Sequence, residues 1–217
     1  MTGTDGLKTK NQSGFFITFE GVEGAGKTTN IEYIAEKIKA SGQELILTRE
    51  PGGTTLSEAI RELLISKDLP EMHHDTELLL MFAARAEHLQ KVILPALNEG
   101  KWVLCDRFTD ASYAYQGAGR GIDAKKIQLL EVMVQGSLRP DATFLFDLDA
   151  NIGLSRAQSR GESDRFEQQH IDFFNRVRSQ YLNMAESDPS RYYIIHAQHE
   201  LNIVKKQIDE ILNKLIV

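Results

Sequence analysis

A glycine-rich loop constrains the fold of this chain more than any other feature. It reads Gly21-Val22-Glu23-Gly24-Ala25-Gly26-Lys27-Thr28. The loop follows an apolar and aromatic run at 15–19 and precedes apolar residues at helical spacing over 30–40, so it joins a predicted strand to a predicted helix. Glycines permit the tight turn that brings backbone N–H groups around phosphate oxygens, and the helix N-terminus adds partial positive charge. The sequence therefore predicts a binding site for the phosphates of a nucleotide.

The end of this loop and a neighbouring strand supply candidates for phosphate and metal chemistry. Lys27 can reach the β- and γ-phosphates, and the Thr28 hydroxyl can bind Mg2+. Asp106 ends an apolar strand-like run, where a carboxylate can orient Mg2+ or its water shell. The acids at the end of a second run, Asp147 and Asp149, are the competing site. Asp106 is preferred because the arginine that follows it can clamp a phosphate through two parallel hydrogen bonds.

Strand and helix patterns alternate along the chain, which favours a parallel sheet covered by helices on both faces. The strand-like runs lie at 15–19, 44–48, 102–106, 143–148 and 192–196. The helical patterns lie at 28–40, 56–65, 76–97, 124–138, about 168–184 and 201–215. A chain of 217 residues can bury a sizeable core. We therefore expect one α/β domain over 15–217, with the polar stretch 1–14 as a flexible leader outside it.

Composition narrows the classes of partner. The net charge is −6, so the chain lacks the overall basic character of a protein that binds a polynucleotide. No run approaches the ~20 apolar residues of a membrane span, and we expect no membrane partner. The one cysteine, Cys105, excludes a disulfide framework and fits a reducing cytoplasm, where we expect the protein to act.

The third helical pattern and a later glycine-rich stretch are candidates for binding a base. Met81 and Phe82 precede Arg85 by four and three residues, so both approach the face that carries its guanidinium. An aromatic or thioether surface beside a guanidinium can hold a flat base, with the arginine donating a hydrogen bond. His88 is interpreted as an ordinary surface or interface histidine. The stretch 112–121, rich in aromatics and glycine, is expected to be a flexible loop that orders around a ligand.

Arginines in two further loops are candidates for binding phosphates. Arg49 precedes a tight-turn signal at the end of the second strand. A later segment carries Arg156, Arg160 and Arg165 around a glycine. Such a segment, at about 153–167, is expected to be a lid that brings cations to the transferring phosphates.

In their order along the chain, these motifs resemble the bacterial thymidylate kinases, P-loop kinases that phosphorylate dTMP. The resemblance covers essentially the whole chain from residue 15. It rests on the segments Phe19 to Thr29, Thr48 to Thr54, Phe82 to Arg85, Asp106 to Phe108, Ala114 to Gly121 and Arg160 to Gln168. It implies a P-loop NTPase-type five-stranded parallel sheet with a mobile lid, Mg-ATP as donor with Mg2+ as cofactor, dTMP as acceptor, and a homodimer.

The resemblance also implies a role for each matching residue. Loop residues 21–28 and Arg156 would hold ATP, and Thr28 and Asp106 would hold the metal. The residues that would bind dTMP are Glu23, Arg49, Arg61, Phe82, Arg85, Arg107, Ser112, Tyr115 and Gln116. Glu23 would meet the 3′-hydroxyl, and Tyr115 would fill the place of a ribose 2′-hydroxyl. The catalytic cations would be Lys27, Arg107, Arg160 and Arg165.

Further details of these roles come from the same resemblance. Arg107 and Arg61 would grip the dTMP phosphate, and Arg85 would address a thymine carbonyl. In one subgroup the loop itself carries the catalytic arginine. Here Gly24 follows Glu23, so that cation would come from the lid.

Two positions depart from the family pattern. Met81 stands where the family often has a phenylalanine, so both Met81 and Phe82 stay candidates for stacking on the base. Ala111 stands before Ser112 where a pair of serines is common, so any hydrogen bond from the first serine is lost.

Two other functions stay open at this point. A kinase for another nucleoside monophosphate would share the fold, although Arg85 and Tyr115 favour a deoxy-pyrimidine. A nucleotide-dependent switch would normally carry Asn-Lys-x-Asp for guanine. The chain's one Asn-Lys pair, Asn213-Lys214, is followed by leucine and isoleucine.

Overall fold

The computed structural model describes residues 14–159, 165–166 and 169–216. Residues 1–13, which are the expected leader without its last residue Gly14, lie outside this part. Residues 160–164 of the expected lid, including Arg160, lie outside it as well. Within the described residues, no helix combines the length and apolarity needed to cross a membrane.

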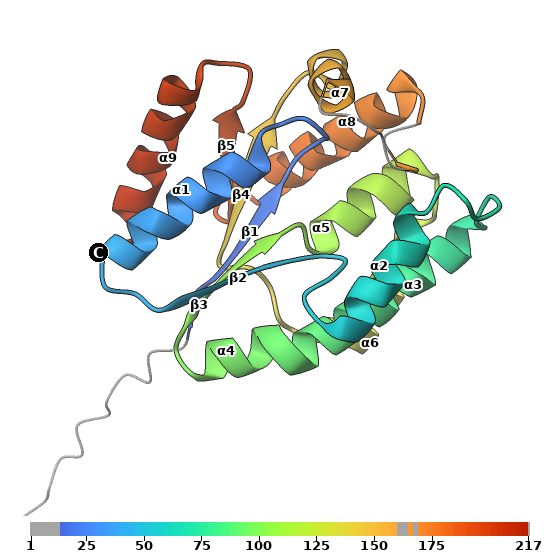
Figure 1. Cartoon of the computed structure of the whole chain (residues 1–217), viewed down its shortest axis with the longest axis horizontal. Coiled ribbons are helices and arrows are strands. Elements are labelled where there is room, and N and C mark those ends of the chain that lie inside the picture. Colours follow the sequence, from blue (N-terminus) through green and yellow to red (C-terminus); the bar gives the residue numbers. More distant parts are fainter. Residues whose placement is uncertain (1–13, 160–164, 167–168, 217) are drawn as a thin grey trace, which may run out of the picture.

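Five parallel strands form the centre of the molecule, as the sequence predicts (Figure 1). They are β1 (Phe16–Glu20), β2 (Leu45–Arg49), β3 (Trp102–Asp106), β4 (Ala142–Asp147) and β5 (Tyr192–His196), in the spatial order β2-β3-β1-β4-β5. The register pairs Asp106 with Phe19 on one side and with Arg49 on the other. The carboxyl ends of β1, β2 and β3 therefore meet at one edge of the sheet, where the strands deliver their last side chains.

Helices cover both faces of the sheet (Figure 1). They are α1 (Lys27–Ala40), α2 (Thr55–Ile65), α3 (His74–His88), α4 (Leu94–Asn98), α5 (Thr109–Ser112), α6 (Ala124–Gln135), α7 (Ala150–Gln158), α8 (Ile171–Ser187) and α9 (Leu201–Leu215). Two π-helical segments, η1 (Leu89–Ile93) and η2 (Tyr113–Gly119), interrupt them. Successive residues of β1 face opposite layers: Phe16 packs with Ile93, whereas Ile17 and Phe19 join a cluster with Ile34 of α1.

The predicted helix over 76–97 is in fact divided into α3, η1 and α4. Pro95 lies in the first turn of α4, directly after the π turn. Proline has no N–H to donate to the carbonyl four residues earlier. The backbone instead takes a π turn, in which the Leu94 N–H donates to the Leu89 carbonyl five residues before it.

The expectation of a flexible loop over 112–121 is wrong, because most of this stretch is helical and buried. α5 and η2 run continuously over 109–119, and Tyr115 and Gln116 are 5% and 1% exposed. Phe173 of α8 packs so closely on Gly119 that a Cβ there would meet its ring. Arg176 donates to the carbonyls of residues 118 and 119. Packing against α8 therefore fixes a segment whose composition is that of a loop.

Candidate active site

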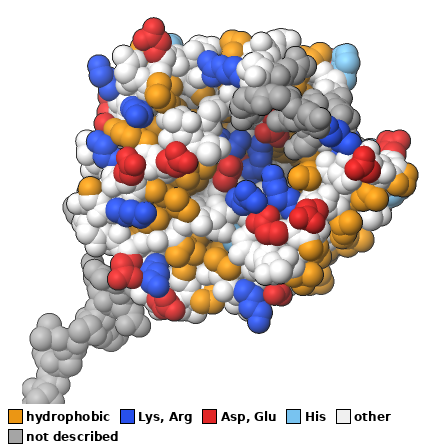
Figure 2. All heavy atoms as spheres, viewed as in Figure 1, with side chains coloured by type: hydrophobic (Ala, Val, Ile, Leu, Met, Phe, Trp, Pro, Cys, Tyr) orange, Lys and Arg blue, Asp and Glu red, His pale blue; other side chains and the backbone are white. Residues whose placement is uncertain are grey.

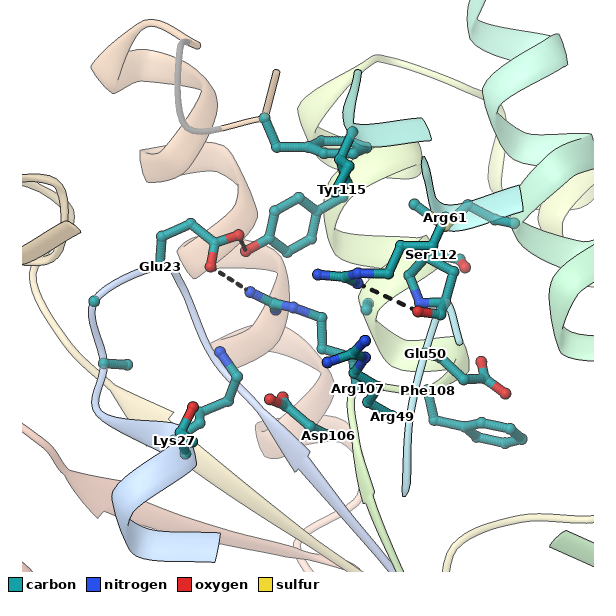
Figure 3. A pocket seen from close by; sticks show the side chains of 18 of the residues that line it. Glu23, Lys27, Arg49, Glu50, Arg61, Asp106, Arg107, Phe108, Ser112 and Tyr115 are labelled. Carbon is teal, nitrogen blue, oxygen red and sulfur yellow. Dashed lines mark hydrogen bonds and ion pairs between the residues drawn. The ribbon is translucent and has the colours of Figure 1, made fainter. Parts of the chain in front are cut away.

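A cavity of about 510 Å³ opens at the carboxyl ends of β1, β2 and β3. Basic side chains gather in this hollow (Figure 2). The glycine-rich loop, the turn after β2, helices α2 and α3, and the segment after β3 all contribute to its lining (Figure 3). Its size is within the range of sites that hold small-molecule ligands.

The glycine-rich loop leaves the N-terminus of α1 open to the cavity. Gly26 caps the helix with φ 78°, no side chain caps it, and its first turn holds no acidic residue. The loop also packs backbone to backbone on α7, where a Cβ on Gly24 would overlap the carbonyl of Gly153. The free N–H groups of this helix start provide a binding site for anions.

Lys27 is the cation that this loop brings to the cavity. Its side chain is 8% exposed, and Nζ donates to the Gly21 carbonyl at 3.4 Å. Burial, followed by the charge of Arg107, lowers the pKa of Lys27. Its ammonium has therefore lost most of its water and lies in position to interact with an anion.

Arg107 connects the loop to the segment after β3 (Figure 3). Its backbone has φ 68°, which turns the side chain back over the sheet edge. The guanidinium donates to the Gly21 carbonyl at 2.8 Å and to Glu23 Oε2 at 2.7 Å, and lies 4.8 Å from the ring centroid of Tyr115. The Tyr115 hydroxyl donates to Glu23 Oε1 at 3.0 Å. Burial raises the pKa of Glu23, but Arg107 and Lys27 outweigh it and hold that pKa below its ordinary value.

Arg85 of α3 lies at the opposite side of the cavity and is 3% exposed. Its Nε donates to Glu50 Oε2 at 2.6 Å. One terminal nitrogen, Nη2, donates to the Phe108 carbonyl and to Ser112 Oγ, both at 3.1 Å. The other, Nη1, is buried and has no hydrogen-bond partner among the described residues. Since an unsatisfied buried donor is costly, Nη1 marks a place where a ligand acceptor would be stabilised.

Of the two candidates for stacking on a base, Met81 lines the cavity. Phe82 is 2% exposed and packs with Leu78 and Ile127, with the Arg85 guanidinium 4.5 Å from its ring centroid. Phe82 is thus a support beneath Arg85, which corrects the expectation that it contacts the base. Helical periodicity explains this result, since position 82 turns towards α6 and position 81 towards the cavity.

Arg49 and Arg61 line the side of the cavity that lies between Arg107 and α2. Arg49 is paired with Glu58 at 2.8 Å, and Arg61 donates to the Pro51 carbonyl at 3.2 Å. The structure therefore brings these two arginines and Arg107 to the same cavity, an arrangement consistent with the phosphate site that the resemblance implies (Figure 3).

The structure separates the two candidate metal sites. Asp106 lines the cavity with Lys27 and Thr28, and its Oδ1 is buried without a partner among the described residues. Asp147 instead binds Arg178 through both oxygens, at 2.7 and 3.0 Å. Asp149 caps α7. No group of three or more His, Cys, Asp or Glu in the described residues could form a cage, so Asp106 and Thr28 suit an ion that keeps most of its waters, as Mg2+ does.

Two of the three lid arginines lie in the part of the chain that the structure describes, and they have different partners. Arg156 lines the cavity and donates to the Ala197 carbonyl at 3.2 Å, whereas Arg160 lies outside the described residues. Arg165 donates to Glu77 Oε2 at 2.6 Å and to the Leu64 carbonyl at 2.9 Å, and is not part of the described lining. The expected position of Arg165 over the transferring phosphates is therefore not found, because a fully buried carboxylate on α3 binds its charge.

Sequence reasoning misjudged or missed three buried residues around the site. His88, expected at the surface, is 0% exposed and hydrogen-bonded to Glu50. Glu77 is also 0% exposed, and it accepts from Gln116 at 2.9 Å as well as from Arg165. Charged residues on a helix usually point to solvent. They are buried only where residues distant in the sequence pair with them. For Glu77, the sequence carries no signal of those partners.

The third of these buried residues, Glu20, lies at the end of β1 and is 0% exposed. It accepts hydrogen bonds from the Phe108 N–H at 2.8 Å and from the Tyr181 hydroxyl at 2.7 Å. Burial, followed by the charge of Asp110, raises the pKa of Glu20 from 4.5 to about 8. Near neutral pH the folded protein therefore holds a proton on this carboxyl group.

We expect the free energy of unfolding to fall as the pH rises from 4.5 to about 8, and to fall less in a Glu20→Gln variant. In this window the folded state binds a proton that the unfolded chain has released, so raising the pH favours unfolding. Glutamine keeps a neutral group that can bond both partners. Urea titrations of both proteins at about pH 5 and about pH 8 measure the difference. Equal pH dependence in the two proteins would contradict the assignment.

Comparison with known proteins gives a consistent result. A family model described as thymidylate kinase matches residues 19–208. The chain is 56% identical over 204 residues to a protein named thymidylate kinase from Pseudomonas savastanoi pv. phaseolicola, covering 94% of this chain and 97% of that one. It is 55% identical over 204 residues, with the same coverage, to the thymidylate kinase of Pseudomonas fluorescens strain Pf0-1. A solved structure of thymidylate kinase from Ehrlichia chaffeensis superposes with a TM-score of 0.75 at 36% identity, covering 92% of this chain and 99% of that one.

Proposed function

Because the chain belongs to the thymidylate kinase family, we propose that it transfers the γ-phosphoryl group of ATP to dTMP, giving ADP and dTDP in a step of dTTP synthesis. One observation in the structure carries this assignment furthest. A single cavity is lined by the glycine-rich loop with Lys27 and by Arg85, whose buried Nη1 donor has no hydrogen-bond partner among the described residues. The first suits a nucleotide's phosphates, and the second suits a base that presents a carbonyl oxygen.

The residues around the cavity divide between the two substrates. The loop 21–28 and Arg156 bind ATP, with its phosphates at the start of α1. The residues proposed to contact dTMP are Glu23, Arg49, Arg61, Met81, Arg85, Arg107, Ser112, Tyr115 and Gln116, all of which line the cavity. The Tyr115 hydroxyl and Glu23 are bonded to each other beside Arg107, which leaves a space suited to a deoxyribose.

Catalysis by these residues rests on position and charge. The acceptor is already a phosphate anion, so the reaction needs no strong base. Lys27 and Arg107 neutralise charge on the phosphates in a site that is largely shielded from water. Thr28 and the Asp106 carboxylate would hold Mg2+ together with its waters, and the ion would there supply further charge neutralisation and alignment of the phosphates.

The test is ADP production from Mg-ATP with separate acceptors: dTMP, dUMP, dCMP, dGMP, AMP, UMP and none. We expect turnover to depend strongly on dTMP. A stronger response to another monophosphate would keep the kinase mechanism and overturn the base-site assignment. Release of ADP that is indifferent to the acceptor would overturn the kinase assignment.

We also propose that the protein acts as a homodimer in the cytoplasm, where ATP and dTMP are available. Exposed apolar residues lie on three helices that pack side by side: Leu56 and Leu63 of α2, Leu79 of α3, and Leu129, Val132 and Met133 of α6. Met133 is 73% exposed, which is unfavourable unless another apolar surface covers it. A second copy related by a two-fold axis presents the same surface.

Sedimentation equilibrium measures this association. We expect the wild type to be dimeric and Met133→Glu to shift it towards monomer. Leu201→Glu, which changes an exposed leucine on α9, serves as the matched control and should stay dimeric. A monomeric wild type would overturn the proposal.

A further inference from the structure

Glu50, at the end of β2, connects two residues of α3 inside the protein. It is 4% exposed. Its Oε2 accepts from Arg85 Nε at 2.6 Å, and its Oε1 accepts from His88 Nδ1 at 3.0 Å. Arg85 and His88 are three residues apart on one helix, so they present neighbouring side chains to the same carboxylate. Each oxygen of Glu50 thus has its own partner on α3.

His88 is held from its other side as well. Its Nε2 lies 2.6 Å from Thr48 Oγ1, and the ring is 0% exposed. Because the Glu50 carboxylate can only accept, the proton of a neutral ring is on Nδ1, and Nε2 accepts from the threonine hydroxyl. The ring also packs directly on Gly53, where φ is +85° and a Cβ would lie 2.5 Å from His88 Nε2. Strand β2 and the turn after it therefore fix the imidazole.

We infer that His88 is a positioning residue for the base site: it holds Glu50 in the orientation that keeps the Arg85 guanidinium in place in the cavity wall. This inference rests on the proposed function, in which Arg85 recognises a carbonyl of the dTMP base. His88 itself is buried away from the cavity and is absent from its described lining. It acts only through Glu50 and Arg85.

The geometry explains how the effect would pass from one residue to the next. With His88 in place, Glu50 uses one oxygen on Arg85, and Arg85 Nη2 is used by the Phe108 carbonyl and Ser112. Without the imidazole, Glu50 Oε1 is buried and lacks its donor. The carboxylate then satisfies both oxygens by taking Nε and Nη2 of Arg85 together, the usual two-bond pairing. This rotation draws Nη2 off Ser112 and moves the guanidinium from its place in the cavity wall.

Three substitutions at position 88 separate positioning from simple packing. His88→Leu fills much of the space and removes both hydrogen bonds. His88→Asn places an amide N–H near the position of Nδ1 and restores the bond to Glu50. His88→Gln places its amide near Nε2, so it keeps the contact with Thr48 and not the bond to Glu50.

The measurements are KM and kcat with dTMP, KM for ATP, and the preference in kcat/KM for dTMP over dCMP. dCMP presents an amino group where dTMP presents the carbonyl, so a displaced Arg85 loses discrimination between them. For His88→Leu and His88→Gln we expect KM for dTMP to rise about tenfold and the preference for dTMP over dCMP to fall about tenfold. In both variants kcat and KM for ATP should change less than about twofold. For Asn we expect values close to the wild type.

The possible results are distinguishable. Wild-type values in the Leu and Gln variants would overturn the inference. So would equal loss of kcat and of both substrates' binding in all three variants, together with a lower Tm, because that pattern reports only a disturbed core. A wild type that does not use dTMP would overturn the proposed function itself, before position 88 is tested.

Discussion

The Lys27→Ala variant is expected to phosphorylate dTMP with a kcat about 10³-fold below that of the wild type. Lys27 has little contact with water, and among the described residues Nζ has only a long 3.4 Å hydrogen bond to the Gly21 carbonyl. Its charge is therefore free to act on phosphate oxygens at low local dielectric, where it has a large effect. Alanine removes this charge and keeps the helix-forming character of the first turn of α1.

Lys37→Ala is the matched control for this prediction. Lys37 belongs to the same helix, but it is 46% exposed and pairs with Asp209 at the surface. Steady-state kinetics measure kcat for both variants, and thermal unfolding measures their Tm. We expect Lys37→Ala to retain normal turnover and Lys27→Ala to retain a normal Tm. Turnover near that of the wild type in Lys27→Ala would remove Lys27 from the mechanism.

The Arg107→Ala variant is expected to lose about 10²–10³-fold in kcat/KM for dTMP, through both a lower kcat and a higher KM. Arg107 is bonded to Glu23 within the cavity at 2.7 Å, and together with Lys27 it offsets the charge of that carboxylate. Its loss leaves Glu23 without its bonded cation, so the carboxylate adds repulsion where the anionic dTMP binds. Alanine keeps a Cβ at a backbone with φ 68°, so the substitution isolates the guanidinium from any change in backbone strain.

Two further variants test the reason behind this effect. Arg107→Lys keeps the positive charge but lacks the planar guanidinium with its two parallel donors. We therefore expect it to have more activity than Arg107→Ala and less than the wild type. Glu23→Gln combined with Arg107→Ala removes the uncompensated carboxylate, and KM for dTMP should then fall below that of Arg107→Ala. Isothermal titration with dTMP measures the binding component directly. Unchanged dTMP affinity in Arg107→Ala would contradict the assignment.

The sheet and the position of the glycine-rich loop at its edge were predictable because local sequence determines them. The strands are short apolar runs, and the motif at 21–28 occupies consecutive positions. Register then follows, since parallel strands align their carboxyl ends and bring Arg49, Asp106 and the loop together. Periodicity and motif spacing are sufficient for this part of the molecule.

The base end of the site was less predictable because it depends on pairs that are distant in sequence. His88 and Arg165 are charged or polar residues on or near helices, and nothing adjacent to them in the sequence shows that Glu50 and Glu77 will bind them. Helical order in η2 depends on α8, which follows it by many residues. Phe82 and Met81 are neighbours, and only the direction of α3 decides which one reaches the cavity.

The contact between Gly24 and Gly153 limits which substitutions these two positions can accept during evolution. A side chain at either position would collide with the backbone of the other segment, and both collisions are with rigid carbonyl groups rather than with flexible chain ends. No single substitution at one position can be compensated by a smaller residue at the other, because both are already glycine. At this junction between the loop and α7, a side chain added at one position cannot be accommodated by a change at the other, so we expect both positions to tolerate few variants.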